Sequence, residues 1–344
     1  MRTMNVAVVG ATGAVGRTML GILAERRFPV GAVHAVASER SAGKRVPYAG
    51  RELEVQPLAT FDFAGVDIAL FSAGGSVSLE CAPRAAAAGA VVVDNTSAFR
   101  RDEDVPLVVP EVNPGDLAKR PRGIIANPNC STIQMVVALA PLHRRARIRR
   151  IVVATYQSVS GAGNRAMEEL RLASAAALAG KAVEPGPVFP HPIAFNCLPQ
   201  IDVFEDDGYT KEEHKMMFET RKIFGEESIR VSATCVRVPV LVGHAEAINV
   251  EFEKPISPDE AREVLAGAPG VELVDAPEER RYPMQSLCAG RDPVLVGRIR
   301  RDPSRENTLD LWIAADNLRK GAALNAVQIA ELLLAEKISS CPRI

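Results

Sequence analysis

The sequence predicts a two-domain α/β protein, with a doubly wound parallel sheet in the first domain and an α+β second domain whose sheet is mostly antiparallel or mixed. The chain has 344 residues, enough for two separate hydrophobic cores. Short apolar runs alternate with segments of helical periodicity over the first third. Longer runs with alternating β-branched residues follow in the second half, as in a sheet with one solvated face.

In the first third, apolar runs that predict strands alternate with segments that predict helices. The strands are expected at residues 5–9, 33–37, 67–73 and 91–93. The helices are expected at residues 15–26 and at the alanine-rich residues 76–88. This alternation indicates a parallel sheet with helices on both faces.

A glycine-rich loop, GATGAVG at residues 10–16, joins the first predicted strand to the first predicted helix. Glycine permits a tight turn there and lets backbone N–H groups approach a pyrophosphate at the helix N-terminus. The spacing is GxxGxxG instead of GxGxxG, so its position between strand and helix carries the prediction. The alternative is a glycine turn that only packs the helix on the strand. We expect a Rossmann-type dinucleotide site made by Gly10, Thr12, Gly13, Ala14, Val15 and Gly16.

The segment after the second predicted strand bears on the choice between NAD and NADP. An acidic residue there would accept from the ribose 2′-hydroxyl of NAD, and Glu39 fits that role. Its neighbours Ser38, Arg40, Ser41 and Lys44 offer hydroxyl and cationic donors for the 2′-phosphate of NADP. Because the donors outnumber the single carboxylate, NADP is the predicted cofactor. A solvated charged loop is the alternative.

The second half predicts the longer strands and the helices of the second domain. Strands are expected at residues 150–158, 229–240, 245–252 and 309–314. Helices at residues 164–179 and 258–266 are expected to cover one face of their sheet, and a last helix is expected at residues 321–337. Residues 185–208, rich in Pro and Asp, predict a long irregular loop or lid, which usually has a functional reason.

Cys130 lies in NPNCSTIQ, residues 127–134, directly before an apolar run that predicts a helix. A cysteine in the first turn of a helix faces unpaired N–H groups and the positive end of the helix dipole, and both favour the thiolate. This is a suitable place for a nucleophile. The alternative is a small buried apolar residue, which is what most free cysteines are.

Composition and charge exclude several classes of function. The formal net charge is −1, so no basic surplus indicates binding to nucleic acid or to an anionic membrane. The six cysteines form no CxxC pair and no zinc-type spacing, so we expect no metal and reduced thiols. No apolar segment is long enough to cross a bilayer, and the N-terminal apolar stretch does not have the form of a signal peptide. A cytoplasmic protein is expected.

Several motifs occur together and in one order along the chain. They are GATGAVG at 10–16, SERSAGK at 38–44, NTSAFR at 95–100, NPNCSTIQ at 127–134, YQSVSGAG at 156–163, CVRVPV and GHAE around 235–246, and ADNL at 315–318 followed by KGAALNAVQIAE. Over nearly the whole chain this set resembles the aspartate-semialdehyde dehydrogenase family.

The resemblance implies both an activity and a division of the chain. The family uses NADPH to convert L-aspartyl 4-phosphate, by reductive dephosphorylation, into L-aspartate 4-semialdehyde for lysine, threonine and methionine synthesis. An NADP-binding domain is implied over residues 1–128, completed by a C-terminal helix over residues 318–344. A catalytic and dimerisation domain is implied over residues 129–317. The assembly is then a homodimer or a homotetramer.

The resemblance also implies a role for individual residues. Cys130 is the nucleophile, His244 the acid/base and Gln157 the amide that orients the substrate. Substrate binding falls to Arg237, Glu212, Asn129 and Gln157, with Arg237 on the α-carboxylate, which suits a bidentate guanidinium. Phosphate binding falls to Lys215 and to Arg100, with the adjacent Arg101 as the competing candidate. The nicotinamide is expected near Ser160, Gly161 and Asn317.

The residues themselves leave some of these roles open. Arg237 and His244 are seven positions apart, so one continuous strand would put them on opposite faces. Pro239 and Gly243 between them indicate that the strand breaks there, which would allow both side chains into one cleft. Glu212 and Lys215 share a helix face, and from spacing alone a surface salt bridge is the simpler interpretation.

Two rival functions remain at this stage. N-acetyl-γ-glutamyl-phosphate reductase uses the same cysteine strategy on an acyl phosphate, but its nucleophile lies in a GCYPT-type sequence, whereas this chain has NCSTI. A non-catalytic paralogue that senses NADP is the second rival. Intact Cys130, Lys215, Arg237 and His244 argue against it.

Overall fold

The computed structural model describes residues 3–339 of the chain. The chain divides into two compact units. The N-terminal unit comprises Met1–Asn129 together with Ala322–Ile344, and the central unit comprises Cys130–Gly321. The N-terminal unit holds the glycine-rich loop, whereas the central unit begins at Cys130.

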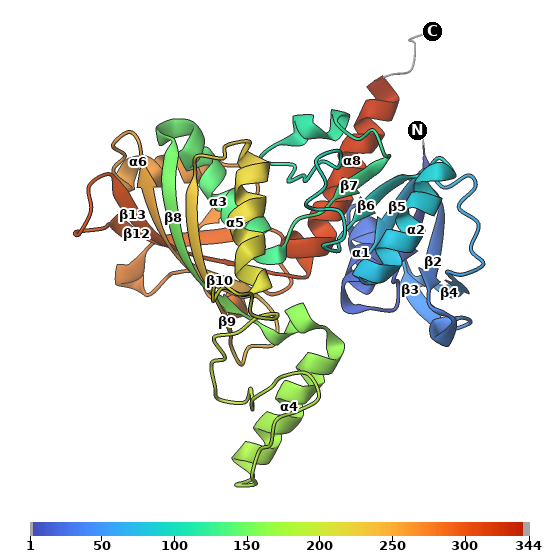
Figure 1. Cartoon of the computed structure of the whole chain (residues 1–344), viewed down its shortest axis with the longest axis horizontal. Helices are drawn as coiled ribbons and strands as arrows, with labels where there is room; N and C mark the ends of the chain where they lie inside the picture. The colour runs from blue at the N-terminus through green and yellow to red at the C-terminus, as the bar shows by residue number, and fades with distance from the viewer. Residues whose placement is uncertain (1–2, 340–344) are drawn as a thin grey trace. The chain divides into compact units, whose positions relative to one another are not determined.

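The N-terminal unit is built on a seven-stranded sheet in the order β3-β4-β2-β1-β5-β6-β7 (Figure 1). Its strands are parallel, except that β3 runs antiparallel to β4. The strands are β1 (Met4–Val9), β2 (Val30–Ala37), β3 (Arg45–Tyr48), β4 (Arg51–Pro57), β5 (Ile68–Phe71), β6 (Val91–Asp94) and β7 (Ile124–Ala126). The prediction of a doubly wound sheet is confirmed for this unit. The hairpin β3–β4 and the short β7 were not predicted.

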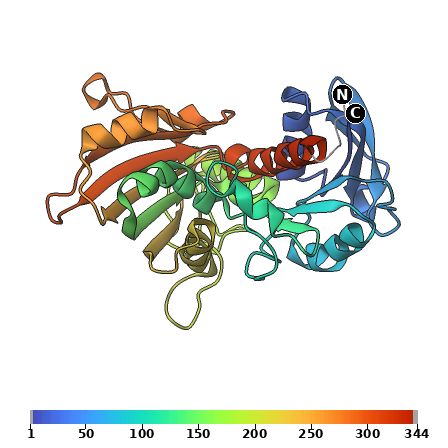
Figure 2. The ribbon, with the colours of Figure 1, turned by 90° about the horizontal axis from the view of Figure 1, so that it is seen from above.

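Helices α1 (Ala14–Glu25), α2 (Gly75–Ala87) and α8 (Leu324–Ser339) pack on this sheet. The apolar residues of α8, such as Val327 and Ile329, belong to the same core as Met19 and Leu20 of α1. Figure 2 shows α8, in red, beside the blue N-terminal elements. A short π-helix (Arg319–Ala323) precedes α8, so the expected last helix begins irregularly. Residues 340–344, which the family resemblance assigns to the C-terminal helix of the NADP-binding domain, lie outside the described part of the chain.

The central unit is built on a six-stranded mixed sheet in the order β11-β12-β13-β10-β8-β9. Its strands are β8 (Ile148–Gln157), β9 (Arg230–Arg237), β10 (His244–Phe252), β11 (Val271–Leu273), β12 (Val294–Arg301) and β13 (Thr308–Ala315). Neighbours pair antiparallel except for β8 with β9 and β11 with β12. This confirms the predicted mixed sheet, although β11 and β12 were missed.

One face of this sheet is covered by α3 (Cys130–Ala146), α5 (Lys211–Phe224) and α6 (Pro258–Ala266). Along β8, Ile151, Val153 and Thr155 are buried toward the helices, while the alternate residues Ala154 and Tyr156 are partly exposed on the other face. The predicted solvated face is therefore present.

The predicted role of the helix at residues 164–179 was wrong. Helix α4 (Asn164–Leu178) projects away from the sheet (Figure 1) and packs on the 3₁₀ turn Val159–Ala162 and on residues near Phe189. Gly163, at φ +89°, turns the chain directly before α4. Helices α3 and α5 cover the sheet in its place. The expected strand at 229–240 also ends earlier, at Arg237, before Pro239.

Candidate active site

The glycine-rich loop has the backbone geometry of an anion cradle. Gly10 has φ +91°, and a Cβ on it would lie 2.3 Å from the carbonyl oxygen of Ser72. A Cβ on Gly16 would lie 2.2 Å from the carbonyl oxygen of Gly10, so only glycine fits either position. Gly13 is the N-cap of α1 and provides no side-chain cap, and the first turn contains no acidic residue. The first N–H groups of α1, at Ala14 and Val15, therefore face a region suited to a phosphate.

The loop after β2 lies beside this cradle. Thr12 Oγ1 is 3.4 Å from Ser41 Oγ, which brings the two loops together. Ser38 is the N-cap of the 3₁₀ turn Glu39–Ser41, and Ser38, Glu39 and Arg40 are all exposed. The predicted donors Ser38 and Arg40 are thus exposed, as is the opposing carboxylate of Glu39, while Ser41 is partly buried.

Cys130 is the first residue of α3, as predicted, and its side chain is partly exposed. Gly321 packs against it closely, since a Cβ on Gly321 would lie 3.0 Å from the Cβ of Cys130. Asn129, directly before it, is buried and is the last residue of its segment of the N-terminal unit. Arg100 and Arg101 also belong to that unit: Arg100 is buried and donates to the carbonyl of Asn95 at 2.9 Å, whereas Arg101 is exposed.

Arg237 and His244 converge in the central unit because the chain breaks between them. Arg237 ends β9, His244 begins β10, and Gly243 at φ +95° makes the turn. Both side chains border Gly161, where a Cβ would lie 3.1 Å from Arg237 Nη1 and 3.3 Å from His244 Nε2. The predicted break is confirmed. A side chain at position 161 would crowd both the guanidinium and the imidazole.

Arg237 interacts electrostatically with Cys130. Arg237 is buried, and its Nη1 donates to the carbonyl of Ser158 at 2.8 Å. Burial lowers the pKa of Arg237, while the charges of Glu212 and Cys130 oppose that change. The guanidinium thus lies within electrostatic reach of the sulfur, and a cation there favours the thiolate.

His244 is fully buried and held by hydrogen bonds in one orientation. Its Nδ1 accepts from the backbone N–H of Ser158 at 3.0 Å, so the proton of the neutral ring is on Nε2. Among the described residues, Nε2 has no hydrogen-bond partner. Burial, and then the charge of Arg237, lower the pKa of His244 to about 3. The ring is therefore neutral near pH 7 and can donate from Nε2.

Gln157, Glu212 and Lys215 form a connected polar row. Gln157 Nε2 donates to Glu212 Oε1 at 3.1 Å, and Lys215 Nζ lies 3.2 Å from Glu212 Oε2. Lys215 also donates to Asp202 Oδ2 at 2.8 Å. Burial alone would lower the pKa of Lys215, but the carboxylates of Glu212 and Asp202 outweigh it and raise that pKa. The lysine is therefore a cation held between the carboxylates of Glu212 and Asp202.

Asn317 ties Ser160 and the turn at Gly243 into the same site. Its Oδ1 accepts from the backbone N–H of Gly243 at 2.9 Å, and its Nδ2 donates to Ser160 Oγ at 2.9 Å. Ser158 Oγ also donates to Asn317 Oδ1 at 3.1 Å. The residues expected near a nicotinamide are thus joined to the backbone that positions His244.

Known proteins match this architecture along the whole chain. The family described as semialdehyde dehydrogenase, NAD binding domain, matches residues 5–120, and the semialdehyde dehydrogenase dimerisation domain matches residues 139–320. A protein of Aquifex aeolicus named aspartate-semialdehyde dehydrogenase is 60% identical over 334 residues, which cover 96% of this chain and 98% of the relative. The chain belongs to the aspartate-semialdehyde dehydrogenase family.

Solved structures of aspartate-semialdehyde dehydrogenases share the fold. The Vibrio cholerae enzyme II, in complex with ASA, matches with a TM-score of 0.95 and 54% identity, covering 97% of this chain and 99% of that one. A more distant enzyme from Candida albicans, with NADP, matches with a TM-score of 0.77 and 27% identity, covering 98% of this chain and 100% of that one. The chain is accordingly an enzyme of this family, with a Rossmann-type nucleotide-binding domain.

Four polar residues of this family member were not singled out from its sequence. Ser158 donates to His244, and Asp202 accepts from Lys215. Gln134, in the same helix as Cys130, donates to Glu246. Ser158 lies in the motif YQSVSGAG and Glu246 in GHAE, so the motifs could have indicated both residues. Gln134 likewise ends the motif NPNCSTIQ, whereas Asp202, at φ +69° in the irregular segment, gave no signal in the sequence.

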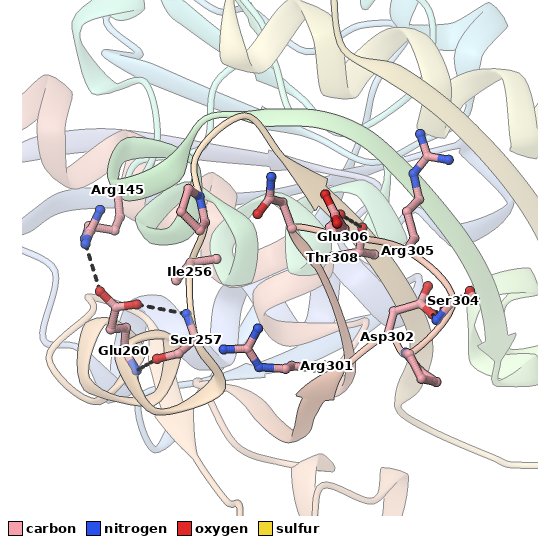
Figure 3. Close-up of a pocket in the computed structure, with 13 residues that line it drawn as sticks. Arg145, Ile256, Ser257, Glu260, Arg301, Asp302, Ser304, Arg305, Glu306 and Thr308 are labelled. Atoms are coloured by element: carbon pink, nitrogen blue, oxygen red, sulfur yellow. Dashed lines mark hydrogen bonds and ion pairs between the residues drawn. The ribbon is translucent and has the colours of Figure 1, made fainter.

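Other possible sites in the described residues are less developed. Within residues 3–339, no group of three or more His, Cys, Asp or Glu side chains is arranged to hold a metal ion. None of the helices in that part of the chain is long and apolar enough to cross a membrane. Figure 3 shows a separate charged hollow of about 570 Å³ in the central unit, where Arg145 pairs with Glu260 at 2.9 Å. None of the predicted site residues lines it.

Proposed function

We propose that the chain catalyses the NADPH-dependent reductive dephosphorylation of L-aspartyl 4-phosphate to L-aspartate 4-semialdehyde, through a thioester on Cys130. The observation that carries this proposal is the cluster of Arg237, His244 and Gly161, with Cys130 within electrostatic reach of the guanidinium. Family membership and the ASA bound by the Vibrio cholerae neighbour support the substrate class. The product would serve lysine, threonine and methionine synthesis.

Cys130 is the proposed nucleophile. Its thiolate attacks the acyl carbon, a C–S bond forms, and the C–O bond to phosphorus breaks so that inorganic phosphate leaves with the electron pair. The N-terminal position in α3 and the cation of Arg237 both favour the thiolate at neutral pH. NADPH, when bound, supplies the hydride that reduces the thioester carbonyl, after which the C–S bond breaks and the aldehyde is released.

His244 acts through its Nε2–H in this proposal. Because Nδ1 is occupied by the backbone N–H of Ser158, the neutral ring offers only a donor to the reacting carbonyl oxygen. Gln157 adds an amide beside it and is itself oriented by Thr155, whose Oγ1 donates to Gln157 Oε1 at 3.0 Å. Donors fixed before the reaction stabilise the developing oxyanion without reorganising during the step.

Arg237 and Glu212 suit the two charged groups at the amino-acid end of the substrate. The guanidinium is a bidentate partner for the α-carboxylate, and Glu212 offers a carboxylate to the α-ammonium. We assign the leaving phosphate to Lys215 and Arg100, with Arg101 as the alternative to Arg100, and assign Asn129 to the substrate pocket beside the nucleophile.

The residues of the N-terminal unit fit a dinucleotide. Gly10, Gly13 and Gly16, with Thr12, would hold the pyrophosphate at the N-terminus of α1, and Ser38, Arg40 and Ser41 would hold a 2′-phosphate. The NADP in the Candida albicans neighbour supports the choice of NADP, which Glu39 opposes. Ser160, Gly161 and Asn317 would lie beside the nicotinamide. The N-terminal unit is thus the proposed NADP-binding domain and the central unit the catalytic one.

We also propose that the active protein is a homodimer formed through the central unit. The match to a family described as a dimerisation domain supports this. A second observation is the apolar surface on the solvated side of the sheet, where Leu241 and Met284 line a hollow with Trp312 and are each at least 36% exposed. A partner copy would cover these side chains.

Replacement of the nucleophile tests the proposed reaction. Cys130→Ala should abolish the phosphate-dependent rise in absorbance at 340 nm with semialdehyde and NADP, while NADP binding stays within about twofold, because the sulfur and the glycine-rich loop are separate sites. Cys197→Ser, at an exposed cysteine, is the matched control and should keep full activity. A trapped acyl adduct should map to the Cys130 peptide by mass spectrometry. Turnover by Cys130→Ala, or an adduct on another residue, would refute the thioester.

A further inference from the structure

We infer that Glu246 and Gln134 form a neutral acid–amide pair that positions the first turn of α3, and with it Cys130, against the strand that carries His244. Glu246 is a positioning residue in this proposal and touches no substrate. The inference deepens the proposed function, because it concerns the placement of the proposed nucleophile.

The two side chains connect the helix to the strand at the level of the site. Gln134 lies four residues after Cys130 in α3, so it is on the same helix face one turn further on. Its Nε2 donates to Glu246 Oε1 at 2.8 Å and approaches the backbone carbonyl of His244 at 3.4 Å. Glu246 and His244 are two residues apart in β10 and therefore point to the same face. The amide of Gln134 thus connects α3, which carries Cys130, to β10, which carries His244.

The two remaining polar atoms of the pair, Gln134 Oε1 and Glu246 Oε2, can form a second hydrogen bond if Glu246 is protonated. The carbonyl of His244 can only accept, which fixes Nε2 of Gln134 on that side and leaves Oε1 as an acceptor. Gln134 Oε1 and Glu246 Oε2 are both buried, and neither has a hydrogen-bond partner among the described residues. A carboxylate could not donate, whereas a protonated Oε2 can donate to Gln134 Oε1 and satisfy both atoms at once. The pair is then closed by two hydrogen bonds.

The electrostatic surroundings favour the neutral acid. Glu246 is fully buried, and this burial raises its pKa well above 4.5, opposed only by the hydrogen bond from Gln134. In the central sheet and the helices that cover it, the buried titratable groups besides Glu246 are Glu212, Glu213 and Glu219 on α5, Cys235 and Arg237 on β9, and His244 and Glu251 on β10, while Cys130 on α3 is partly exposed. Arg237, the cation among these groups, donates to the carbonyl of Ser158.

The first experiment compares Glu246→Gln with Glu246→Leu. Glutamine keeps a donor and an acceptor in place of the neutral acid, so the rate of Cys130 alkylation by iodoacetamide should stay within about threefold of the native rate. Leucine removes the second partner of Gln134, and both the alkylation rate and kcat should fall by about tenfold or more as the nucleophile shifts, while KM for NADP is unchanged. Peptide mass spectrometry follows Cys130, with exposed Cys197 as an internal reference.

The second experiment tests whether Glu246 is protonated, by measuring how the stability of the fold depends on pH. A pKa raised by folding means that the folded state retains a proton which the unfolded state loses above about pH 4.5. The stabilisation is complete below that pH and is lost as pH rises toward the folded-state pKa, by up to about tenfold in the unfolding constant per pH unit. Glu246→Gln should remove this part of the slope in denaturant titrations between pH 5 and about 8.

A swapped variant covers the case in which Glu246→Leu does not fold. Glu246→Gln combined with Gln134→Glu exchanges acid and amide and should restore alkylation at Cys130, whereas Gln134→Glu alone places two acids together and should slow it. The inference is overturned if Glu246→Gln loses alkylation as strongly as Glu246→Leu, if the swap fails to recover it, or if Glu246→Gln leaves the pH slope unchanged. An active Cys130→Ala would refute the thioester but not the pair, which the pH slope still tests.

Discussion

Arg237 combines a structural bond with the proposed contact to the substrate carboxylate. Its Nη1 already donates to Ser158, so the rest of the fork is left for a ligand. Arg237→Lys keeps the charge but loses the planar bidentate geometry, and KM for semialdehyde should rise by about tenfold or more, with a smaller change in kcat. Arg230→Lys, at the exposed start of the same strand, is the matched control and should leave KM unchanged. Unaltered steady-state kinetics in Arg237→Lys would remove this residue from the carboxylate site.

His244 should be uncharged throughout the neutral range. Its pKa is lowered from 6.5 to about 3 in the folded state, first by burial and then by Arg237. The unfolded chain therefore takes up the proton first as pH falls, so the stability from the neutral ring is present above about pH 6.5 and is lost toward pH 3. In NMR titrations its ring signals, assigned with a His244→Asn variant, should not shift between pH 5.5 and about 8. A midpoint near 6.5 would contradict the lowered pKa of the buried ring.

The predictability of the site differed from residue to residue. The position of Cys130 at the start of a helix was predictable from the apolar run that follows it, and the break between Arg237 and His244 was predictable from Pro239 and Gly243. The bond from Ser158 to His244 was not predictable, since 86 positions separate the two and only the pairing of β8 with β10 joins them. Buried polar pairs give no periodic signal in a sequence.

At the scale of elements, α5 presents Glu212 and Lys215 from a helix whose start is fixed by a capping box. Thr210 accepts from the N–H of Glu213 at 3.3 Å, while Glu213 Oε2 accepts from the N–H of Thr210 at 2.7 Å. Glu213 Oε1 also accepts from the N–H of Cys235 at 2.8 Å, so the cap joins α5 to β9. Thr210→Ala should lower the free energy of unfolding by about 1 kcal/mol and raise KM for phosphate.

Helix α6 offers the matched control for that cap. Ser257 and Glu260 form the same capping box, and they line the charged hollow of Figure 3, away from the proposed site. Ser257→Ala should therefore lower the free energy of unfolding by a similar amount, about 1 kcal/mol, in denaturant titrations, with KM for phosphate unchanged. If both variants altered KM alike, the kinetic effect would follow general stability and not the position of α5.

The elements that were predicted and those that were missed differ in burial. Strand β1 is buried along nearly its whole length, and the apolar run marked it clearly. In β4 only Val55 is buried, so its charged residues give no apolar run that would predict a strand. Strand β11 has only three residues, all of intermediate exposure. Helix α4 was predicted correctly as a helix, but its packing depends on the turn at Gly163, which hydrophobic periodicity does not report.

At the scale of the whole molecule, the proposed dimer depends on the solvated side of the central sheet. Tyr156 and Trp312 meet there with ring centroids 5.0 Å apart, next to a hollow of about 1010 Å³ lined by Leu241 and Met284. Leu241→Asp combined with Met284→Asp would place two charges in a desolvated interface, and the mass from sedimentation should fall from dimer to monomer, or from tetramer to dimer. Leu79→Asp, at a 57% exposed position on α2, is the control and should leave the mass unchanged. An unchanged mass in the double variant would mean that the copies associate through a different surface.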